Sequence, residues 1–182
     1  MDPLKAAAAL NRAAKRLMDR GNEGAALSCF MKALDFSDGS AQYDENVPAA
    51  LHSNTAFLLS ALRRKYEAAR HFELAAAIYE KNGDAQGHGE QLMNLGSIFR
   101  DIGTLPDALE YYERSLAVFA GAGLDAGVAD QHANIGHILW RMGERESSME
   151  HFRRALALYR QVGDGERAEL VERNLAVLSA GL

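Results

Sequence analysis

Cysteine and proline are scarce in this chain, and long hydrophobic runs are missing. Cys29 is the single cysteine among 182 residues, so an internal disulfide is impossible, which is typical of a reducing compartment. The three prolines leave the backbone able to form helix almost throughout. No segment approaches the roughly 18 apolar residues needed to cross a bilayer, and the first residues lack the apolar stretch of a signal peptide. We expect a cytoplasmic protein with no membrane insertion.

Motifs for catalysis and cofactor binding are also missing. The sequence contains no phosphate-binding loop, no nucleophile elbow and no paired-histidine zinc motif. The six histidines show no ligand spacing, and His132 replaces an apolar residue of a helix stripe, so we interpret it as a core residue. A formal net charge of −5 gives no attraction to nucleic acid. We predict no enzyme, no cofactor, no metal site and no nucleic-acid partner.

What the chain does contain is a repeat. Asparagine recurs at a spacing of 40 residues, at Asn54, Asn94, Asn134 and Asn174. A fixed period in this range indicates a stack of one supersecondary unit. The interior of a helix does not favour asparagine, so the recurrence of this side chain needs a reason.

Each copy of the repeat predicts two helices. The clearest copy has two apolar stripes with the spacing of amphipathic helices. The first stripe is Leu92, Leu95, Gly96 and Phe99. The second stripe is Ala108, Leu109, Tyr112, Leu116 and Phe119. Between the stripes, Gly103 is expected to end the first helix and Thr104 to cap the second. In the turns between copies, Asp84 and Asp164 are expected to act as helix caps.

These stripes resemble the tetratricopeptide repeat, whose pattern is W-x2-L-G-x2-Y, then A-x3-F, then P. Here the pattern reads Leu92-x2-Leu95-Gly96-x2-Phe99 with Ala108-x3-Tyr112, without the closing proline and with a period of 40 rather than 34. That version is similar to the long repeats of cell-polarity adaptors and kinesin light chains. The resemblance implies an all-α fold, a right-handed α-solenoid of four repeats with a C-terminal capping helix. We expect one domain over 1–182, with repeats at about 4–38, 44–82, 84–122 and 125–162 and a capping helix at about 165–180.

The repeated asparagines are predicted to lie away from the core. Asn94 projects roughly 140° from the centre of its apolar stripe. In this family the first helices line a concave groove, so the resemblance places the four amides there. An amide can pair both polar groups of a peptide bond, and related long solenoids carry such an asparagine ladder. Specificity would then come from neighbouring residues, namely Phe57, Met93, Ser97, Arg100, His137, Trp140 and Arg141.

The leading hypothesis is therefore an adaptor that binds an extended peptide segment of another protein. Alternatively, the amides bond the adjacent helix and only fix the stacking, and Trp140 is half-buried packing. A second hypothesis is a self-assembling homo-oligomeric scaffold, joined through the apolar ends Ala6–Ala9 and Leu178–Leu182. A small secretion-type chaperone is a third, which the ladder and the longer period argue against.

Overall fold

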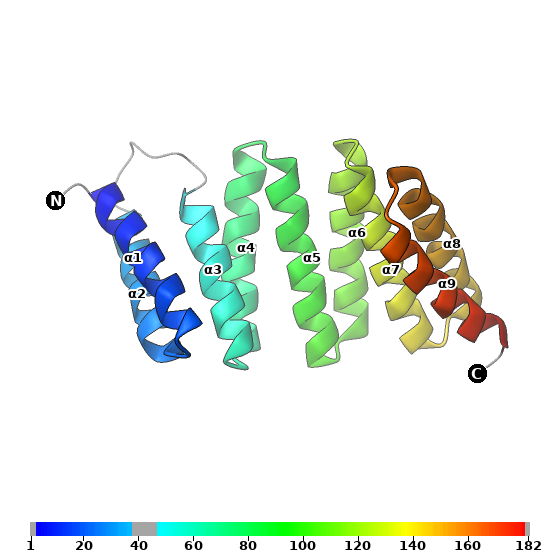
Figure 1. The fold of residues 1–182 in the computed structure, drawn as a ribbon, viewed down its shortest axis with the longest axis horizontal. Helices are drawn as coiled ribbons and strands as arrows, with labels where there is room; N and C mark the ends of the chain where they lie inside the picture. The colour runs from blue at the N-terminus through cyan, green and yellow to red at the C-terminus, as the bar shows by residue number, and fades with distance from the viewer. Residues whose placement is uncertain (1–2, 38–46, 181–182) are drawn as a thin grey trace. The chain divides into compact units, whose positions relative to one another are not determined.

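The computed structural model describes residues 3–37 and 47–180, and these residues form nine α-helices and no strand (Figure 1). The chain divides into two compact units, one ending at Gln91 and the other beginning at Leu92. Within each unit, helices that follow one another in the sequence pack together. The predicted all-α helical repeat fold is confirmed. No helix in the described ranges has the length and apolar character needed to cross a membrane.

The first unit contains α1 (Pro3–Asp19), α2 (Glu23–Ser37), α3 (Val47–Ala61), α4 (Lys65–Lys81) and the start of α5 (Ala85–Ile102). Its core is built around Phe30, with Leu51 and Leu58 contributed by α3. Cys29 is half-buried and packs against this core as a small apolar residue. The repeat limits expected at 38 and 44 lie outside the described residues.

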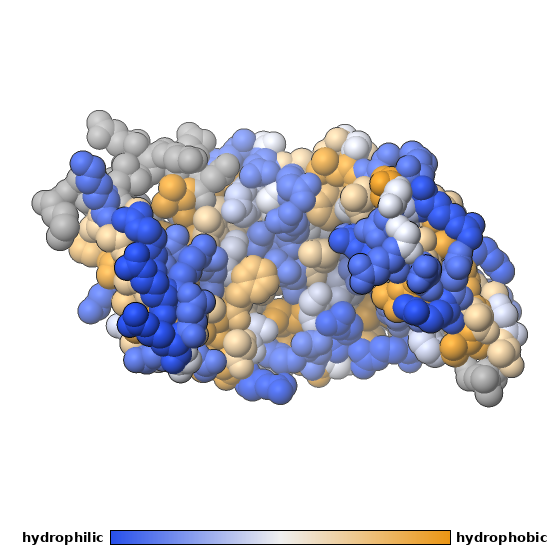
Figure 2. All heavy atoms as spheres, viewed as in Figure 1, coloured by the Kyte–Doolittle hydropathy of each residue, from blue (hydrophilic) through white to orange (hydrophobic). Residues whose placement is uncertain are grey.

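The second unit contains the rest of α5, then α6 (Leu105–Gly121), α7 (Asp125–Met142), α8 (Arg145–Val162) and α9 (Gly165–Ala180). Phe152 and Tyr159 of α8 are buried against Val171 and Leu178 of α9. The helix expected at about 165–180 is therefore present and packs on α8. The visible side of α1 is mostly hydrophilic, whereas that of α9 mixes hydrophilic and hydrophobic residues (Figure 2).

The turns between helices follow a spacing of 20 residues, half the repeat. A residue with positive φ stands at positions 63, 83, 103, 123, 143 and 163, and all are glycine except Arg63. The residue after each turn donates its backbone N–H to the carbonyl five positions earlier, as Asp164 does to Tyr159 at 2.8 Å. This bond satisfies a carbonyl that the helix end leaves open. The helix end predicted at Gly103 is confirmed, and α7 ends in the same way at Gly143.

The aspartate caps are confirmed, whereas Thr104 occupies the predicted cap position of α6 without making a capping bond. An Asp84 carboxylate oxygen accepts the N–H of Gly87 at 2.8 Å, and Asp164 accepts that of Arg167 at 3.0 Å. Thr104 makes no side-chain cap bond, and its hydroxyl instead donates to the Phe99 carbonyl at 3.4 Å. Its ψ of 78° lies outside the extended region that capping residues adopt, so the hydroxyl points back to the end of α5.

Small residues let the two helices of a repeat approach closely. A Cβ built on Gly96 would lie 2.7 Å from the ring of Tyr112, and one on Gly136 would lie 3.0 Å from the ring of Phe152. Ser148 of α8 donates its hydroxyl to the Gly136 carbonyl at 2.7 Å. The helices therefore touch where any larger side chain would hold them apart.

The two apolar ends expected to join copies of the chain are largely covered. Ala6 and Ala7 are buried in the first unit, and Leu178 is buried in the second. Only Ala9 of the first segment, and Ser179 and Ala180 of the second, are exposed, while 181–182 lie outside the described residues. The apolar surface at the described ends is therefore smaller than expected, because Ala6, Ala7 and Leu178 are buried within their own units.

Candidate functional site

The repeated asparagines occupy one position of successive first helices. Asn54 lies on α3 in the first unit, whereas Asn94, Asn134 and Asn174 lie on α5, α7 and α9 in the second. All four side chains are half-buried. The second unit therefore presents three register-matched amides on its first helices.

Three of these amides use their nitrogen atoms within the protein. Asn54 donates to the side-chain oxygen of Asn11 on α1 at 3.3 Å. The Asn174 amide nitrogen lies 3.4 Å from Nε2 of His137 on α7. Asn134 donates to Gln131, one turn earlier in α7, at 3.3 Å. These distances exceed the ordinary range of about 2.7–3.2 Å, so the bonds to adjacent helices exist but are weak.

A cavity of about 270 Å³ lies in the second unit between α7, α8 and α9, with α5 contributing one residue. Its walls bring together four residues that the sequence singled out, Met93, Asn134, His137 and Asn174. Leu170 of α9 also lines it and is 49% exposed. The cavity therefore combines amides with apolar surface.

One wall of this cavity is an ion-pair network that sequence reasoning missed. An Asp130 oxygen accepts the Tyr159 hydroxyl at 2.7 Å and the Arg167 guanidinium at 2.6 Å. Arg167 also lies 3.2 Å from Asp164 and over the Tyr159 ring. Burial, and then Asp130, raises the pKa of the Tyr159 hydroxyl, while Asp130 raises the pKa of Arg167. Every charged group of this wall is thus bound to another.

A departure from the repeat pattern marks this network in the sequence. Glycine stands at 87 and 127, where an added Cβ would lie 2.6 Å from the rings of Tyr79 and Phe119. Forty residues further on, the same position holds Arg167, beside Tyr159. The replacement by arginine of the glycine that the two preceding repeats share was the available signal.

His137 lines the cavity and also lies near the exposed Trp140. The His137 ring lies edge to face on Phe152 with the centroids 5.0 Å apart, and 6.5 Å from the ring of Trp140. Burial, with a smaller effect from Arg100, lowers the pKa of His137, so the ring is neutral near pH 7. Trp140 is 38% exposed and does not line the cavity.

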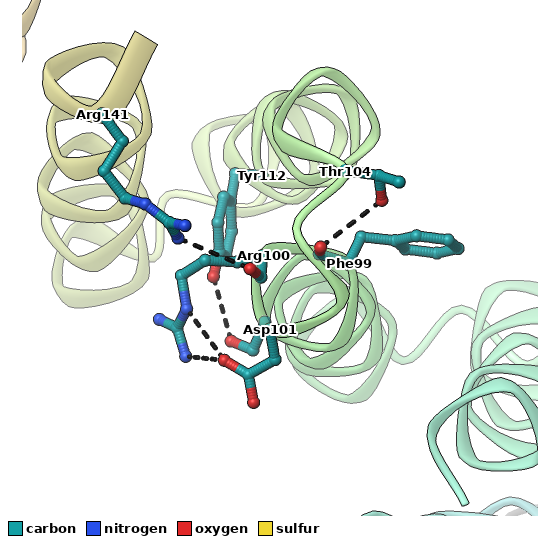
Figure 3. A network of polar contacts seen from close by, with 7 residues as sticks. Phe99, Arg100, Asp101, Thr104, Tyr112 and Arg141 are labelled. Atoms are coloured by element: carbon teal, nitrogen blue, oxygen red, sulfur yellow. Dashed lines mark hydrogen bonds and ion pairs between the residues drawn. The ribbon is translucent and has the colours of Figure 1, made fainter.

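A second polar cluster surrounds the end of α5 (Figure 3). The hydroxyls of Ser97 and Tyr112 lie 3.0 Å apart, and Arg100 pairs with Asp101 at 3.2 Å. Arg141 of α7 donates to the Arg100 carbonyl at 3.4 Å. The predicted residues Ser97, Arg100 and Arg141 are therefore neighbours, but they are separate from the cavity walls.

Phe57 belongs to the first unit, like Asn54. Its ring is 52% exposed and lies edge to face on Phe72, with the centroids 5.1 Å apart. It provides an exposed aromatic surface on α3.

Histidines pair between the two helices of a repeat. The Nδ1 atoms of His132 and His151 lie 3.2 Å apart, and those of His52 and His71 lie 2.9 Å apart. His132 is buried, in agreement with its interpretation as a core residue. Burial, and then the charges of His151 and Arg154, lowers its pKa to about 4. Among the described residues, no three potential metal ligands come together.

Comparisons with known proteins bear on the fold. Residues 89–161 match the sequence profile of the tetratricopeptide repeat, while the search of curated proteins gives no match. A similar solved structure is aspartyl phosphate phosphatase F from Bacillus subtilis, with a TM-score of 0.83, 19% identity, and 94% of this chain aligned to 45% of that one. BtubC (BKLC) from P. vanneervenii has a TM-score of 0.73 and 22% identity, over 99% of this chain and 83% of that one.

A third similar structure is the Rap conjugation gene regulator of the plasmid pLS20 in complex with the Phr* peptide. Its TM-score is 0.69 at 19% identity, with 93% of this chain aligned to 46% of that one. The chain thus spans about half the length of two of these three proteins. At such identities the likeness establishes the fold alone. Together with the match of residues 89–161 to the tetratricopeptide repeat profile, it confirms the resemblance inferred from the stripes.

Proposed function

We propose that this chain is a protein-interaction adaptor that holds an extended segment of a partner protein on its first helices. The observation that carries the proposal is the cavity of the second unit, which gathers Asn134, Asn174, His137 and Met93 in one place. One protein of the same fold is described in complex with a peptide, which supports peptide binding as a use of this fold.

The amides would bind the backbone of the partner segment without selecting its side chains. The bonds that now engage Asn54, Asn134 and Asn174 are 3.3–3.4 Å long, so exchanging them for bonds to a partner's backbone has a small cost. Each new bond would contribute only about 0.5–1.5 kcal/mol, whereas micromolar affinity requires about 8 kcal/mol. Apolar contacts must therefore supply much of the affinity.

The test is a paired capture from a lysate of the source organism. Wild-type protein, the Asn94→Ala/Asn134→Ala variant and a Gln161→Ala control would be immobilised side by side. Gln161 is suitable because its exposed amide also makes a long bond, 3.4 Å to Asp125, away from the cavity. We expect a protein that wild type and control retain and that the double variant loses while its circular dichroism is unchanged. Equal retention by all three would refute the asparagine ladder.

A further inference from the structure

We propose that the α7–α9 pocket receives one uncharged aliphatic side chain of the bound partner segment. This pocket is the cavity of the second unit lined by Met93, Ala133, Asn134, His137, Leu170 and Asn174. The inference rests on the proposed function, which supplies the bound segment, and it adds a residue preference that the amides alone cannot provide.

The apolar part of the pocket comes from a local departure from the repeat. The position of Leu170 on α9 is occupied by Glu90 on α5 and by Asp130 on α7. Leu170 is nevertheless 49% exposed at the pocket. Met93 and Ala133 are half-buried on the facing helices. An aliphatic side chain placed among these three residues would remove their exposed surface from water.

The charges of the wall favour an uncharged occupant. Asp130 and Asp164 both bind Arg167, so two carboxylates share one guanidinium. Burial lowers the pKa of His137, which leaves that ring without a compensating charge. The two charged groups that line the pocket, Asp130 and Arg167, therefore pair with each other, and Asp164 adds a negative charge beside Arg167 outside the lining. The lining has no unpaired cation to receive an acidic residue. An aliphatic side chain fits, and aspartate or glutamate beside it would be repelled.

The size and rim of the pocket fit a single side chain and its peptide unit. The volume of about 270 Å³ lies below the roughly 300–1,000 Å³ of small-molecule sites. Asn134 and Asn174 stand on two of its helices with their amide nitrogens engaged in the protein. Each amide oxygen can accept an N–H from the main chain of the ligand.

The experiment selects displayed random 12-residue peptides on the full chain, as wild type, Leu170→Gln and Val177→Gln. Val177 is the matched control because it is an exposed aliphatic residue of the same helix, 39% exposed, outside the pocket lining. We expect peptides from the wild type to share one aliphatic position with acidic residues depleted beside it. Leu170→Gln should bind these peptides about tenfold more weakly and lose the preference, whereas Val177→Gln should retain both.

The other outcomes distinguish failure of the pocket proposal from failure of the proposed adaptor function. If peptides bind wild type and Leu170→Gln equally, or without a shared aliphatic position, the pocket is refuted. The adaptor function then stands, provided that Asn94→Ala/Asn134→Ala still abolishes their binding. If Val177→Gln loses binding as strongly as Leu170→Gln, the effect belongs to α9 as a whole and the pocket is again refuted. If no peptide binds wild type, the pocket and the proposed function both fail.

Discussion

Gln91 and Gln131 occupy the same repeat position, one in each unit, and only Gln91 is satisfied. Ser53 donates to the Gln91 side-chain oxygen at 2.9 Å, and the Gln91 nitrogen donates to the Gly87 carbonyl at 3.3 Å. In the second unit the position of Ser53 is held by Met93, and the buried nitrogen of Gln131 has no hydrogen-bond partner. A buried unsatisfied donor costs stability. Met93 lines the pocket, so the second unit has apolar surface at the candidate site where the first has a satisfied polar pair.

The two units also differ where the helices of a repeat meet. The first unit places Ala14 and Ala56, both fully buried, at the position that Gly96 and Gly136 occupy in the second. The second unit therefore has no room for a methyl group at this contact, as the added Cβ positions show. The contact between the two helices of a repeat thus accommodates a methyl group in the first unit and not in the second.

The largest effect is expected from Gly96→Ala. The new methyl would lie 2.7 Å from the Tyr112 ring, which the Ser97 hydroxyl holds in place. Overpacking costs about 1–3 kcal/mol and should exceed the helix-propensity gain of about 1 kcal/mol. Urea denaturation should show a net loss, and a smaller one for Gly136→Ala because its contact begins at 3.0 Å. A Gly96→Ala protein as stable as wild type would show that the two halves tolerate a methyl equally.

The next effect concerns the histidine pairs, which both units share. The His132 pKa is lowered from 6.5 to about 4 in the folded protein, so the unfolded chain binds more protons between these values. Unfolding free energy should therefore fall as pH is lowered from about 6.5 toward 4, by at most about 1.4 kcal/mol per pH unit. The variant His132→Leu/His151→Tyr introduces the residue types that the preceding repeat has at the equivalent positions, Leu92 and Tyr111. Denaturation at pH 7 and pH 5 should show a smaller difference for this variant, and an unchanged difference would contradict the assignment.

A smaller effect should separate the two glutamines. Gln91→Leu removes the bonds of the Gln91 amide to Ser53 and to the Gly87 carbonyl, leaves the Ser53 hydroxyl with the Ala49 carbonyl alone, and should cost about 1 kcal/mol. Gln131→Leu removes a buried donor that has no partner, along with one weak bond to Asn134, and should be neutral or stabilising. The urea midpoint of Gln91→Leu should therefore fall, whereas that of Gln131→Leu should stay the same or rise. Equal destabilisation by both substitutions would show that Gln131 is satisfied in solution.

The smallest effect is expected at Arg63. Its φ of 65° is a left-handed conformation that disfavours any residue with a Cβ. Its side chain is exposed, so Arg63→Gly should stabilise the first unit by about 0.5–1 kcal/mol and raise the melting temperature by a few degrees. The converse Gly103→Arg should lower it in the second unit. A loss of stability in Arg63→Gly would show that the arginine makes a contact worth more than the strain.

Particular elements show how far sequence reasoning reached. The stripe of Leu92, Leu95 and Gly96 predicted α5, and Asp84 and Asp164 predicted caps that the structure contains. Thr104 has the residue type of a cap, yet its hydroxyl bonds backward to Phe99. The sequence showed where each helix begins and ends. It did not show whether the hydroxyl of Thr104 would bond the first turn of α6 or the end of α5.

The candidate site was readable only in part. The period identified Asn134 and Asn174, and Met93 and His137 were predicted as neighbours of the amides, but nothing in the spacing showed that Leu170 would join them around a cavity. The sequence by itself determined the helices, their 40-residue repeat, the glycine turns and the final helix. These depend on contacts within a few residues along the chain. Only the tertiary structure decided that Asp130 would hold both Tyr159 and Arg167, because that choice depends on side chains from three helices competing for the same partners in space.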